Sequence, residues 1–393
     1  MQYIIGVAGL TLVFGMAFIV SNDRKKIKYR PILTMLILQF VLGFLLLNTS
    51  AGNVLISTIA NGFTALLNCA REGINFVFGR LANPDDPIFF MSVLMPITFI
   101  SALIGILQHW HILPFIIKYI GLALSKVNGM GKLESYNAVA SAILGQSEVF
   151  ISVKKLLGPL PPNRLYTLCA SAMSTVSMSI VGAYMVMIEP KYVVTALVLN
   201  LFGGFIIASI INPYAVKPED DILVVAETKR QSFFEMLGEY ILDGFKVGVI
   251  VCAMLIGFVG IITLINNVFL GIIGISFQEI LGYLFSPFAF FMGIPMAECV
   301  DAASLMATKI VANEFVAMMQ LSSGTVILSA KSVAIVSIFL VSFANFSSIG
   351  IIAGAVKALN EEKGNVVACF GLRLLYGATL VSILNATIVG LII

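Results

Sequence analysis

The chain has 393 residues, of which 59% are hydrophobic and only 11% are charged. Soluble domains carry roughly 25% charged residues, so this chain has too little polar surface for a water-soluble fold. Its net charge of +3 is small and dispersed, and gives no indication of nucleic-acid binding.

Apolar segments of about the length that crosses a bilayer recur along the whole chain. The first of them, residues 3–20, has no basic residue before it and no small-residue cleavage site after it. We therefore interpret it as a membrane helix rather than a signal peptide. In chain order, the predicted spanning helices lie near residues 2–20, 31–48, 89–108, 166–187, 191–212, 242–265, 329–356 and 366–393.

Four stretches do not fit this pattern, at residues 52–82, 109–130, 131–160 and 275–322. Two of them, 131–160 and 275–322, contain apolar helical segments interrupted by Gly, Pro, Asn, Ser and Glu. Non-helical backbone at membrane depth is tolerated only where protein or a water-filled cavity satisfies it. We therefore expect an all-α polytopic membrane protein with eight transmembrane helices and two re-entrant helical hairpins.

The basic residues set the expected orientation, because Lys and Arg are retained on the cytoplasmic side of short loops. A cluster of five basic residues between Arg24 and Arg30 places the first loop inside. With eight spans and two hairpins, most of the 23 basic residues then lie inside and both termini lie outside. The amphipathic segment 233–240 is expected to lie along the cytoplasmic interface.

The long polar linker, residues 213–235, divides the chain into two halves with matching content. Each half has a broken hairpin with a glycine and a glutamate expected near its tip, Gly145 and Glu148 in the first and Gly293 and Glu298 in the second. In each half a span rich in serine and small residues follows. Paired interruptions in two halves indicate a transporter site, and one hairpin from each face implies an inverted repeat.

Carboxylates at membrane depth cost at least ~2.5 kcal/mol, so they persist mainly where they have a partner or a function. Glu148 ends the segment Leu144-Gly145-Gln146-Ser147-Glu148, where a glycine breaks the helix beside polar side chains. Such a tip offers the donors and acceptors that a neutral polar heterocycle needs. Glu314, Asn345 and Ser348 can bond paired hydroxyls. The simpler alternative is that these polar groups link helices, as they commonly do in membranes.

Enzyme motifs are absent from the sequence: there is no GxSxG, HExxH or Walker A pattern. The five cysteines have no CxxC spacing, so they indicate neither a metal site nor a disulfide framework. We expect no enzyme, no organic cofactor and no certain metal site. The energy for transport would then come from an ion gradient.

Three motifs follow one another along the chain: Gly145-Gln146-Ser147-Glu148, then Ala307-x-Lys309-xxx-Asn313-Glu314-Phe315-Val316-Ala317-Met318, then Phe343-Ala344-Asn345-Phe346-Ser347-Ser348. Together they resemble the concentrative nucleoside transporters, close to the bacterial nucleoside permeases of the NupC type. The resemblance runs essentially from end to end, and it implies a homotrimer in which a transport domain moves against a fixed scaffold.

On this chain the resemblance implies scaffold and interfacial helices in 1–130, a first transport repeat in 131–212, a linker with an interfacial helix and a scaffold span in 213–274, and a second transport repeat in 275–393. The implied nucleobase contacts are Gly145, Gln146, Ser147 and Glu148. The implied ribose contacts are Glu314, Asn345 and Ser348. Phe343 is most simply a packing residue, and the resemblance implies that its ring lies beside the substrate.

One position bears on the coupling ion. The sodium-coupled bacterial members of the family that this chain resembles carry Asn where it has Ser141. The positions that accompany this Asn are Leu144, Ser179 and Ile180 in this chain. Losing the amide carbonyl removes an oxygen ligand from a hard cation, and NupC-type permeases with this serine are proton-driven.

We therefore expect a proton:nucleoside symporter of a bacterial plasma membrane, which takes uridine, other pyrimidine nucleosides and adenosine. Three alternatives remain open. A sodium-coupled carrier would follow a sodium gradient, a channel-like pore would never exceed equilibrium, and a membrane-embedded enzyme would turn substrate over without net transport.

Overall fold

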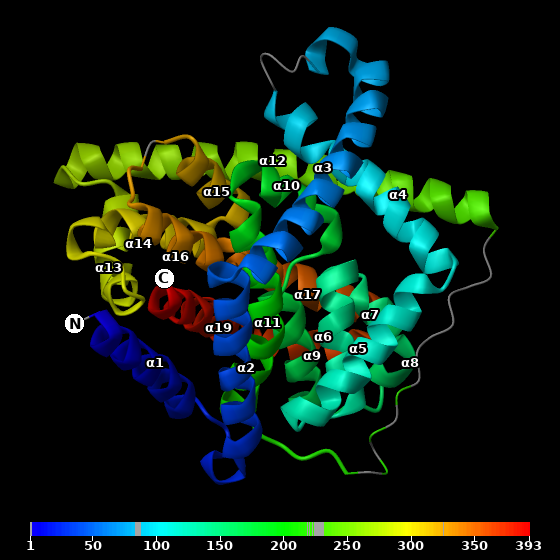
Figure 1. Cartoon of the computed structure of the whole chain (residues 1–393), viewed down its shortest axis with the longest axis horizontal. Coiled ribbons are helices and arrows are strands. Elements are labelled where there is room, and N and C mark those ends of the chain that lie inside the picture. Colours follow the sequence, from blue (N-terminus) through cyan, green and yellow to red (C-terminus); the bar gives the residue numbers. More distant parts are fainter. Residues whose placement is uncertain are drawn as a thin grey trace.

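A computed structural model describes residues 2–82, 88–217, 219, 221, 223, 232–324 and 326–393. In this part of the chain every regular element is a helix (Figure 1). The all-α membrane fold predicted from composition and hydropathy is therefore confirmed. Residues 218, 220, 222 and 224–231 of the predicted linker 213–235 lie outside the described residues.

Before the first hairpin the chain forms α1 (Gln2–Ile19), η1 (Arg24–Lys26), α2 (Tyr29–Asn48), α3 (Ser50–Phe78), η2 (Gly79–Ala82), the π-helical turn η3 (Phe90–Leu94), α4 (Pro96–His109) and α5 (Ile112–Asn128). The stretch 52–82, which fitted no single span in the sequence pattern, belongs mostly to α3, a continuous helix of 29 residues. A Thr49 side-chain cap starts this helix, and Gly79 ends it with a positive φ of 53°.

The first repeat consists of α6 (Lys132–Leu144), α7 (Val149–Ser152), α8 (Lys154–Leu157), α9 (Pro162–Ser174), α10 (Met178–Met187) and α11 (Pro190–Ile211). The predicted span 166–187 is thus two helices separated at residues 175–177. A proline in the first turn of α9 and of α11 explains where these helices begin, because proline fits the first helical turn without losing a hydrogen bond.

The second half contains α12 (Phe233–Ile273), α13 (Phe277–Phe291), η5 (Met296–Glu298), α14 (Cys299–Val311), α15 (Glu314–Ser322), α16 (Ala330–Leu340), α17 (Phe346–Leu359), α18 (Glu361–Cys369) and α19 (Gly371–Ile392). The predicted span 329–356 is divided at residues 341–345, and the predicted span 366–393 is divided at Phe370.

The segment 233–240 is not a helix of its own, and its place along the cytoplasmic interface stays a prediction. These residues are the first turns of α12, a helix of 41 residues that runs across the width of the molecule (Figure 1). A capping box of Ser232 and Glu235 starts α12, and nothing interrupts the helix before Gly274. The start of this helix packs on α4, because the Phe233 ring lies edge-on to His109 of that helix at 5.7 Å and a side chain added at Gly105 would meet the Tyr240 ring.

Helix contacts pair the two halves of the chain. Helix α5 packs against α6 as α13 packs against α14, and α6 packs against α9 as α14 packs against α16. Helix α7 contacts α17 as α15 contacts α10, and α11 contacts α19 directly. Each hairpin thus contacts a helix of the other half in the same way. Such matching contacts are expected when two structurally related repeats share an interface. The inverted orientation of the repeats relative to the bilayer stays a prediction.

The same pairing shows that the tip of the second hairpin lies at other residues than the sequence predicted. The counterpart of the first tip, residues 145–148, is the interruption at 312–313 between α14 and α15, and not the region of Gly293 and Glu298. The latter two residues lie in the turn between α13 and α14, where the Glu298 carboxylate accepts hydrogen bonds from the backbone and hydroxyl of Ser329. The expected tip was therefore wrong.

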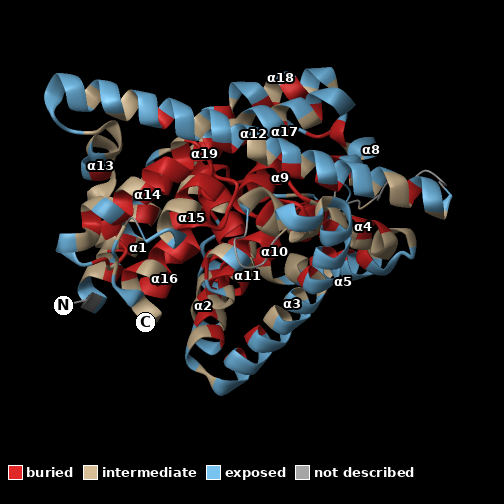
Figure 2. Cartoon of the chain, turned by 90° about the horizontal axis from the view of Figure 1, so that it is seen from above, coloured by how far each residue is buried: buried red, intermediate tan, exposed pale blue. Residues whose placement is uncertain are grey.

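Burial separates central from peripheral helices (Figure 2). In α11 and in α19, 78% of the most apolar window is buried, against 17% in α12. Seven helical segments are long and apolar enough to cross a membrane in the described chain, with α1, α16 and α17 as shorter apolar helices. The exposed apolar sides of α3 and α12 therefore face lipid or another protein chain.

A buried polar network joins α2 to the central pair of helices. The side-chain amide of Gln39 donates to the Asn385 oxygen at 2.8 Å and to the Leu199 carbonyl at 2.8 Å. The Asn385 amide donates to the Asn200 oxygen at 2.7 Å, and Asn200 in turn donates to the Val341 carbonyl at 2.7 Å. This chain of hydrogen bonds connects α2, α11 and α19 to the interruption between α16 and α17.

Candidate functional site

The two interrupted helices of the repeats meet at their breaks. The backbone amide of Phe343, in the break 341–345, donates to the carbonyl of Thr175, in the break 175–177, at 3.2 Å. Helix breaks leave carbonyls and amides without intrahelical partners. The meeting point of the two repeats therefore concentrates backbone polar groups, with Phe343 itself almost fully buried beside them.

Glu314 is the centre of a hydrogen-bonded cluster at this junction. It is the first residue of α15, directly after the second hairpin tip, and only 4% of it is exposed. Its Oε1 accepts from the Tyr184 hydroxyl at 2.7 Å, and its Oε2 accepts from the Asn345 amide at 3.0 Å. The cluster joins α10 of the first repeat to α15 and α17 of the second.

Asn345 is oriented from its other side by the start of α17. Its Oδ1 accepts from the Ser348 backbone amide at 2.9 Å, which is an N-cap bond, and from the Ser347 hydroxyl at 2.7 Å. With the oxygen fixed in this way, the Asn345 amide group points to Glu314. The predicted residues Glu314, Asn345, Ser348 and Phe343 are thus brought together.

The first hairpin tip begins at Gly145, whose φ of 113° and ψ of 174° belong to a region that only glycine occupies readily. A Cβ there would lie 2.8 Å from Glu148 Oε2 and 3.1 Å from Ser177 Cβ. The tip therefore lies against the 175–177 break. Ser147 donates to Glu148 Oε2 at 3.0 Å, and Glu148 is exposed in the isolated chain.

Two polar atoms of the predicted site are buried without a hydrogen-bond partner in the described chain. They are Gln146 Oε1, at the first tip, and Ser348 Oγ, at the start of α17. Buried polar atoms are nearly always paired in folded proteins. These two are consequently available to a polar ligand, one on each side of the junction.

The base of the first hairpin is fixed by a buried ion pair. Arg164 on α9 donates from Nε to Glu134 Oε1 at 2.6 Å and from Nη2 to Glu134 Oε2 at 3.0 Å. The Tyr214 hydroxyl adds a third hydrogen bond to Glu134 at 3.0 Å. Because Glu134 lies in the first turn of α6, this bidentate pair ties α6 to α9 and sets the position of the tip.

The four ion-coupling candidates lie at the ends of α6 and α10. The Ser141 hydroxyl donates to the Asn137 carbonyl of its own helix at 2.7 Å, and Ser179 shares a 2.8 Å hydrogen bond with Ser177. Leu144 ends α6 and Ile180 lies in the first turn of α10. The two helices contact each other, although the hydroxyls of Ser141 and Ser179 each bond within their own element.

The structure adds two residues that the sequence reasoning did not single out. Tyr184 directly follows the small-residue stretch 181–183, and its ring packs edge-on against Phe315 at 5.1 Å. Lys309, part of the second motif, is fully buried and donates three hydrogen bonds. A tyrosine in an apolar span and a lysine in a membrane hairpin were signals that could have identified both.

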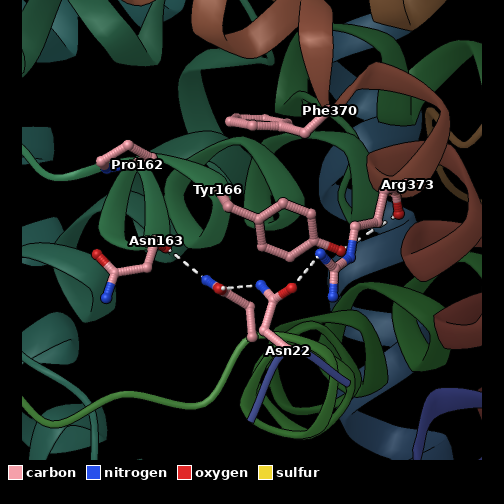
Figure 3. Close-up of a pocket in the computed structure, with 7 residues that line it drawn as sticks. Asn22, Pro162, Asn163, Tyr166, Phe370 and Arg373 are labelled. Carbon is pink, nitrogen blue, oxygen red and sulfur yellow. Dashed lines mark hydrogen bonds between the residues drawn. The ribbon is translucent and has the colours of Figure 1, made fainter. Parts of the chain in front are cut away.

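Two cavities, of ≈ 360 and ≈ 440 Å³, lie away from these residues. The first lies where Asn22, Asn163 and Arg373 come together, beside the rings of Tyr166 and Phe370 (Figure 3). There Arg373 Nη2 donates to the Ile211 carbonyl at 3.0 Å, and the Asn212 amide donates to the Asn163 carbonyl at 2.7 Å. These bonds join the end of α11 to α9 and α19, so this cavity belongs to a structural junction.

Three family models match the chain in succession. The model described as the N-terminus of Na+ dependent nucleoside transporters matches residues 8–81, and a nucleoside recognition model matches residues 90–191. The model described as the C-terminus of Na+ dependent nucleoside transporters matches residues 192–390. This last model covers Glu314, Phe343, Asn345 and Ser348.

Similar proteins cover the whole length. The chain is 36% identical to the purine nucleoside transport protein NupG of Bacillus subtilis, with 100% of both chains covered. It is 30% identical to the nucleoside permease NupC of Helicobacter pylori, with 98% of this chain and 97% of that protein covered.

Its structure is similar to a variant of CNTnw in an outward-facing state, with a TM-score of 0.94, 28% identity, and 100% and 98% of the two chains covered. The inward-facing, substrate-bound structure of CNTnw matches with a TM-score of 0.93 and 27% identity, over 100% and 98% of the two chains. The fold is thus the one that CNTnw keeps in both states.

Proposed function

Since this chain belongs to the concentrative nucleoside transporter family, we propose that it couples nucleoside uptake to a proton gradient across a bacterial plasma membrane. It is a nucleoside transporter with helices long and apolar enough to span a bilayer, and not an enzyme. The coupling ion, the substrate range and the residues that bind substrate are the proposed parts.

The observation that carries the site assignment is the cluster around Glu314. A buried carboxylate whose two oxygens accept from Tyr184 and Asn345 can exchange either donor for the vicinal hydroxyls of a ribose. Charged acceptors make stronger hydrogen bonds than neutral ones. We assign the ribose to Glu314, Asn345 and Ser348, with the ring of Phe343 beside it.

The nucleobase is assigned to the first hairpin tip, Gly145 to Glu148. The unpartnered Gln146 Oε1 supports this assignment, because a side-chain amide can pair with the edge of a base. Ser147 and Glu148 add a hydroxyl and a carboxylate next to it. The two halves of a nucleoside would then be bound by the two repeats.

Proton coupling rests on Ser141. An amide side chain at this position would offer a carbonyl oxygen to a hard cation, whereas the Ser141 hydroxyl is already bonded to its own helix. Sodium coupling through the ends of α6 and α10, at Leu144, Ser179 and Ile180, is the alternative that the experiment below separates.

Transport is proposed to proceed by an elevator-type movement of residues 131–212 and 275–393 against residues 1–130 and 213–274. The exposed apolar sides of α3 and α12 support a scaffold role in a homotrimer. CNTnw, which shares the fold, has both inward-facing and outward-facing structures. Both termini are proposed to lie outside.

Uptake of radiolabelled uridine into proteoliposomes tests this proposal. An inward proton gradient and an inward sodium gradient are compared at fixed pH, and the recovered label is analysed for chemical change. We expect accumulation of intact uridine with protons alone. Accumulation that requires sodium would contradict proton coupling, equilibration without accumulation would favour a channel-like pore, and modified label would favour an enzyme.

Substrate range is tested by competition against labelled uridine. We expect other pyrimidine nucleosides and adenosine to compete. The relative with 36% identity is, by its name, a purine nucleoside transport protein. Competition by inosine and guanosine that exceeds competition by cytidine would therefore replace the pyrimidine assignment by a purine one.

A further inference from the structure

Lys309 places its side-chain amine in one of the least accessible parts of the molecule. It lies in α14, two residues before the end of the helix, and has no exposed surface. Its ammonium donates to the Phe339 carbonyl at 3.1 Å, to Ser342 Oγ at 2.7 Å and to Ser382 Oγ at 3.1 Å. An ammonium has three donor hydrogens, so every one of them has a partner.

The three acceptors come from three different elements that meet at the second break. Phe339 is in the last turn of α16, Ser342 is in the break 341–345, and Ser382 is in the middle of α19. The carbonyls at a helix C-terminus lack intrahelical donors and carry partial negative charge. Lys309 satisfies the Phe339 carbonyl. Through Ser342 it also holds the break 341–345, which ends at Asn345.

Lys309 is also the counter-charge of the proposed ribose site. Glu314 follows it in the same hairpin, on the other side of the tip, and is buried as well. They do not form a direct ion pair, because the Glu314 oxygens are bonded to Tyr184 and Asn345. Removing one of two buried opposite charges leaves the other uncompensated, which is strongly unfavourable.

The first repeat has no equivalent cation. Counted back from the last residue of α6, the position that corresponds to Lys309 is Ala142. In that repeat Ser174 Oγ, at the end of α9, and Asn137 Oδ1, on α6, are buried without a donor in the described chain. The two repeats thus share their helix contacts but differ in charge at the same place.

We infer that Lys309 is a tethered cation that keeps the second break and Glu314 in their binding geometry, so that a mobile coupling ion acts only through the first repeat. This inference rests on the proposed function. Lys309 is then a positioning residue, which neither touches the nucleoside nor carries a transported proton. In the second repeat the chain itself supplies the cationic group, and in the first repeat this place is left to the ion.

The test uses Lys309→Ala, which reproduces the first-repeat residue, in reconstituted protein. Two rates are measured: uridine counterflow, which exchanges substrate without a gradient, and gradient-driven uptake. We expect both to fall together, by about tenfold or more, which is the effect of leaving buried polar groups unpaired. Propylammonium, which matches the deleted atoms and charge, is expected to restore part of both rates, and tetramethylammonium is not.

Lys331→Ala is the matched control. Lys331 lies on α16 and its ammonium donates to the Gly390 carbonyl at 2.9 Å, so it also links α16 to α19 but outside this cluster. We expect it to keep both rates. If Lys309→Ala does not fold, the double variant Ser342→Ala, Ser382→Ala removes two of the three acceptors and is expected to lower both rates in the same proportion.

Two results would overturn the inference. Loss of gradient-driven uptake with intact counterflow would make Lys309 the proton carrier, and unchanged rates would show that its charge is dispensable. Both results require that the wild-type protein transports uridine in the same assay. Wild-type protein without uridine transport would instead refute the proposed function.

Discussion

The carboxylate of Glu314 is the strongest hydrogen-bond acceptor among the buried residues proposed to bind ribose. Glu314→Gln keeps the size of the side chain and removes the charge. Hydrogen bonds to charged groups contribute roughly 1.5–3 kcal/mol each, so uridine Kd is expected to rise by at least about tenfold. Glu279→Gln, at the exposed start of α13, is the control, because that carboxylate caps only its own helix. Unchanged uridine affinity in Glu314→Gln would refute the ribose assignment.

Tyr184 orients that carboxylate through one hydroxyl. In Tyr184→Phe the ring contact with Phe315 is retained and the 2.7 Å hydrogen bond to Glu314 is lost. We expect the KM for uridine to rise by about tenfold, since a hydrogen bond to a charged group is removed. Tyr376→Phe is the control, because its hydroxyl donates to the Met16 carbonyl on the outer helix α1. Equal effects of the two variants would argue that Tyr184 acts only in packing.

Sequence motifs identified the carboxylate and amide of this cluster because intramembrane polar residues are costly and therefore conspicuous. Tyr184 and Lys309 were not singled out, because their roles depend on contacts with residues far along the chain. The Tyr184 partner is 130 positions away, and the partners of Lys309 are 30, 33 and 73 positions away. A sequence pattern reports periodicity within an element, and it does not report which elements meet.

The first hairpin depends on one backbone conformation at its tip. Gly145→Ala would place a Cβ against Glu148 and Ser177 and would force alanine into a region that costs of order 1–3 kcal/mol. We expect uridine uptake to fall severalfold with little change in expression. The control is Gly158→Ala on the same hairpin, where a Cβ has only Asn360 Nδ2 nearby, at 3.8 Å, and φ is −55°. Normal uptake by Gly145→Ala would contradict the assigned tip geometry.

The second hairpin shows that composition alone does not locate the helix break at a hairpin tip. Gly293 and Pro295 made the turn between α13 and α14 the conspicuous break in sequence, whereas the counterpart of the first tip at 312–313 contains neither glycine nor proline. There Asn313 starts α15 by accepting from the Val316 amide at 3.0 Å. An asparagine cap can interrupt a helix as effectively as glycine, but it is also common in uninterrupted polar positions.

Movement of one set of helices against another can be tested by a cross-link. Gly182 on α10 faces Leu67 on α3, with the added Cβ 3.4 Å from the leucine Cδ2. In a background without the native cysteines, a disulfide between Gly182→Cys and Leu67→Cys would join the proposed transport domain to the proposed scaffold. We expect it to stop uridine uptake reversibly.

The controls are the same double variant kept reduced and the two single variants, Gly182→Cys and Leu67→Cys, under oxidising conditions. We expect uptake to continue in all three. Uptake that persists when the Gly182–Leu67 pair is fully oxidised would contradict the proposal that residues 131–212 and 275–393 move together against the rest of the chain.

The buried network of Gln39, Asn385 and Asn200 has a consequence for biosynthesis. Gln39 emerges from the ribosome long before Asn385, its partner 346 positions later. Until α19 is inserted, Asn200 also lacks the amide that donates to it. The amino-terminal half of the protein therefore cannot complete its polar pairing until synthesis has finished. A nascent chain truncated before α19 should keep α2 accessible to proteases and quality-control factors, and the last helix made should complete the assembly of the first ones.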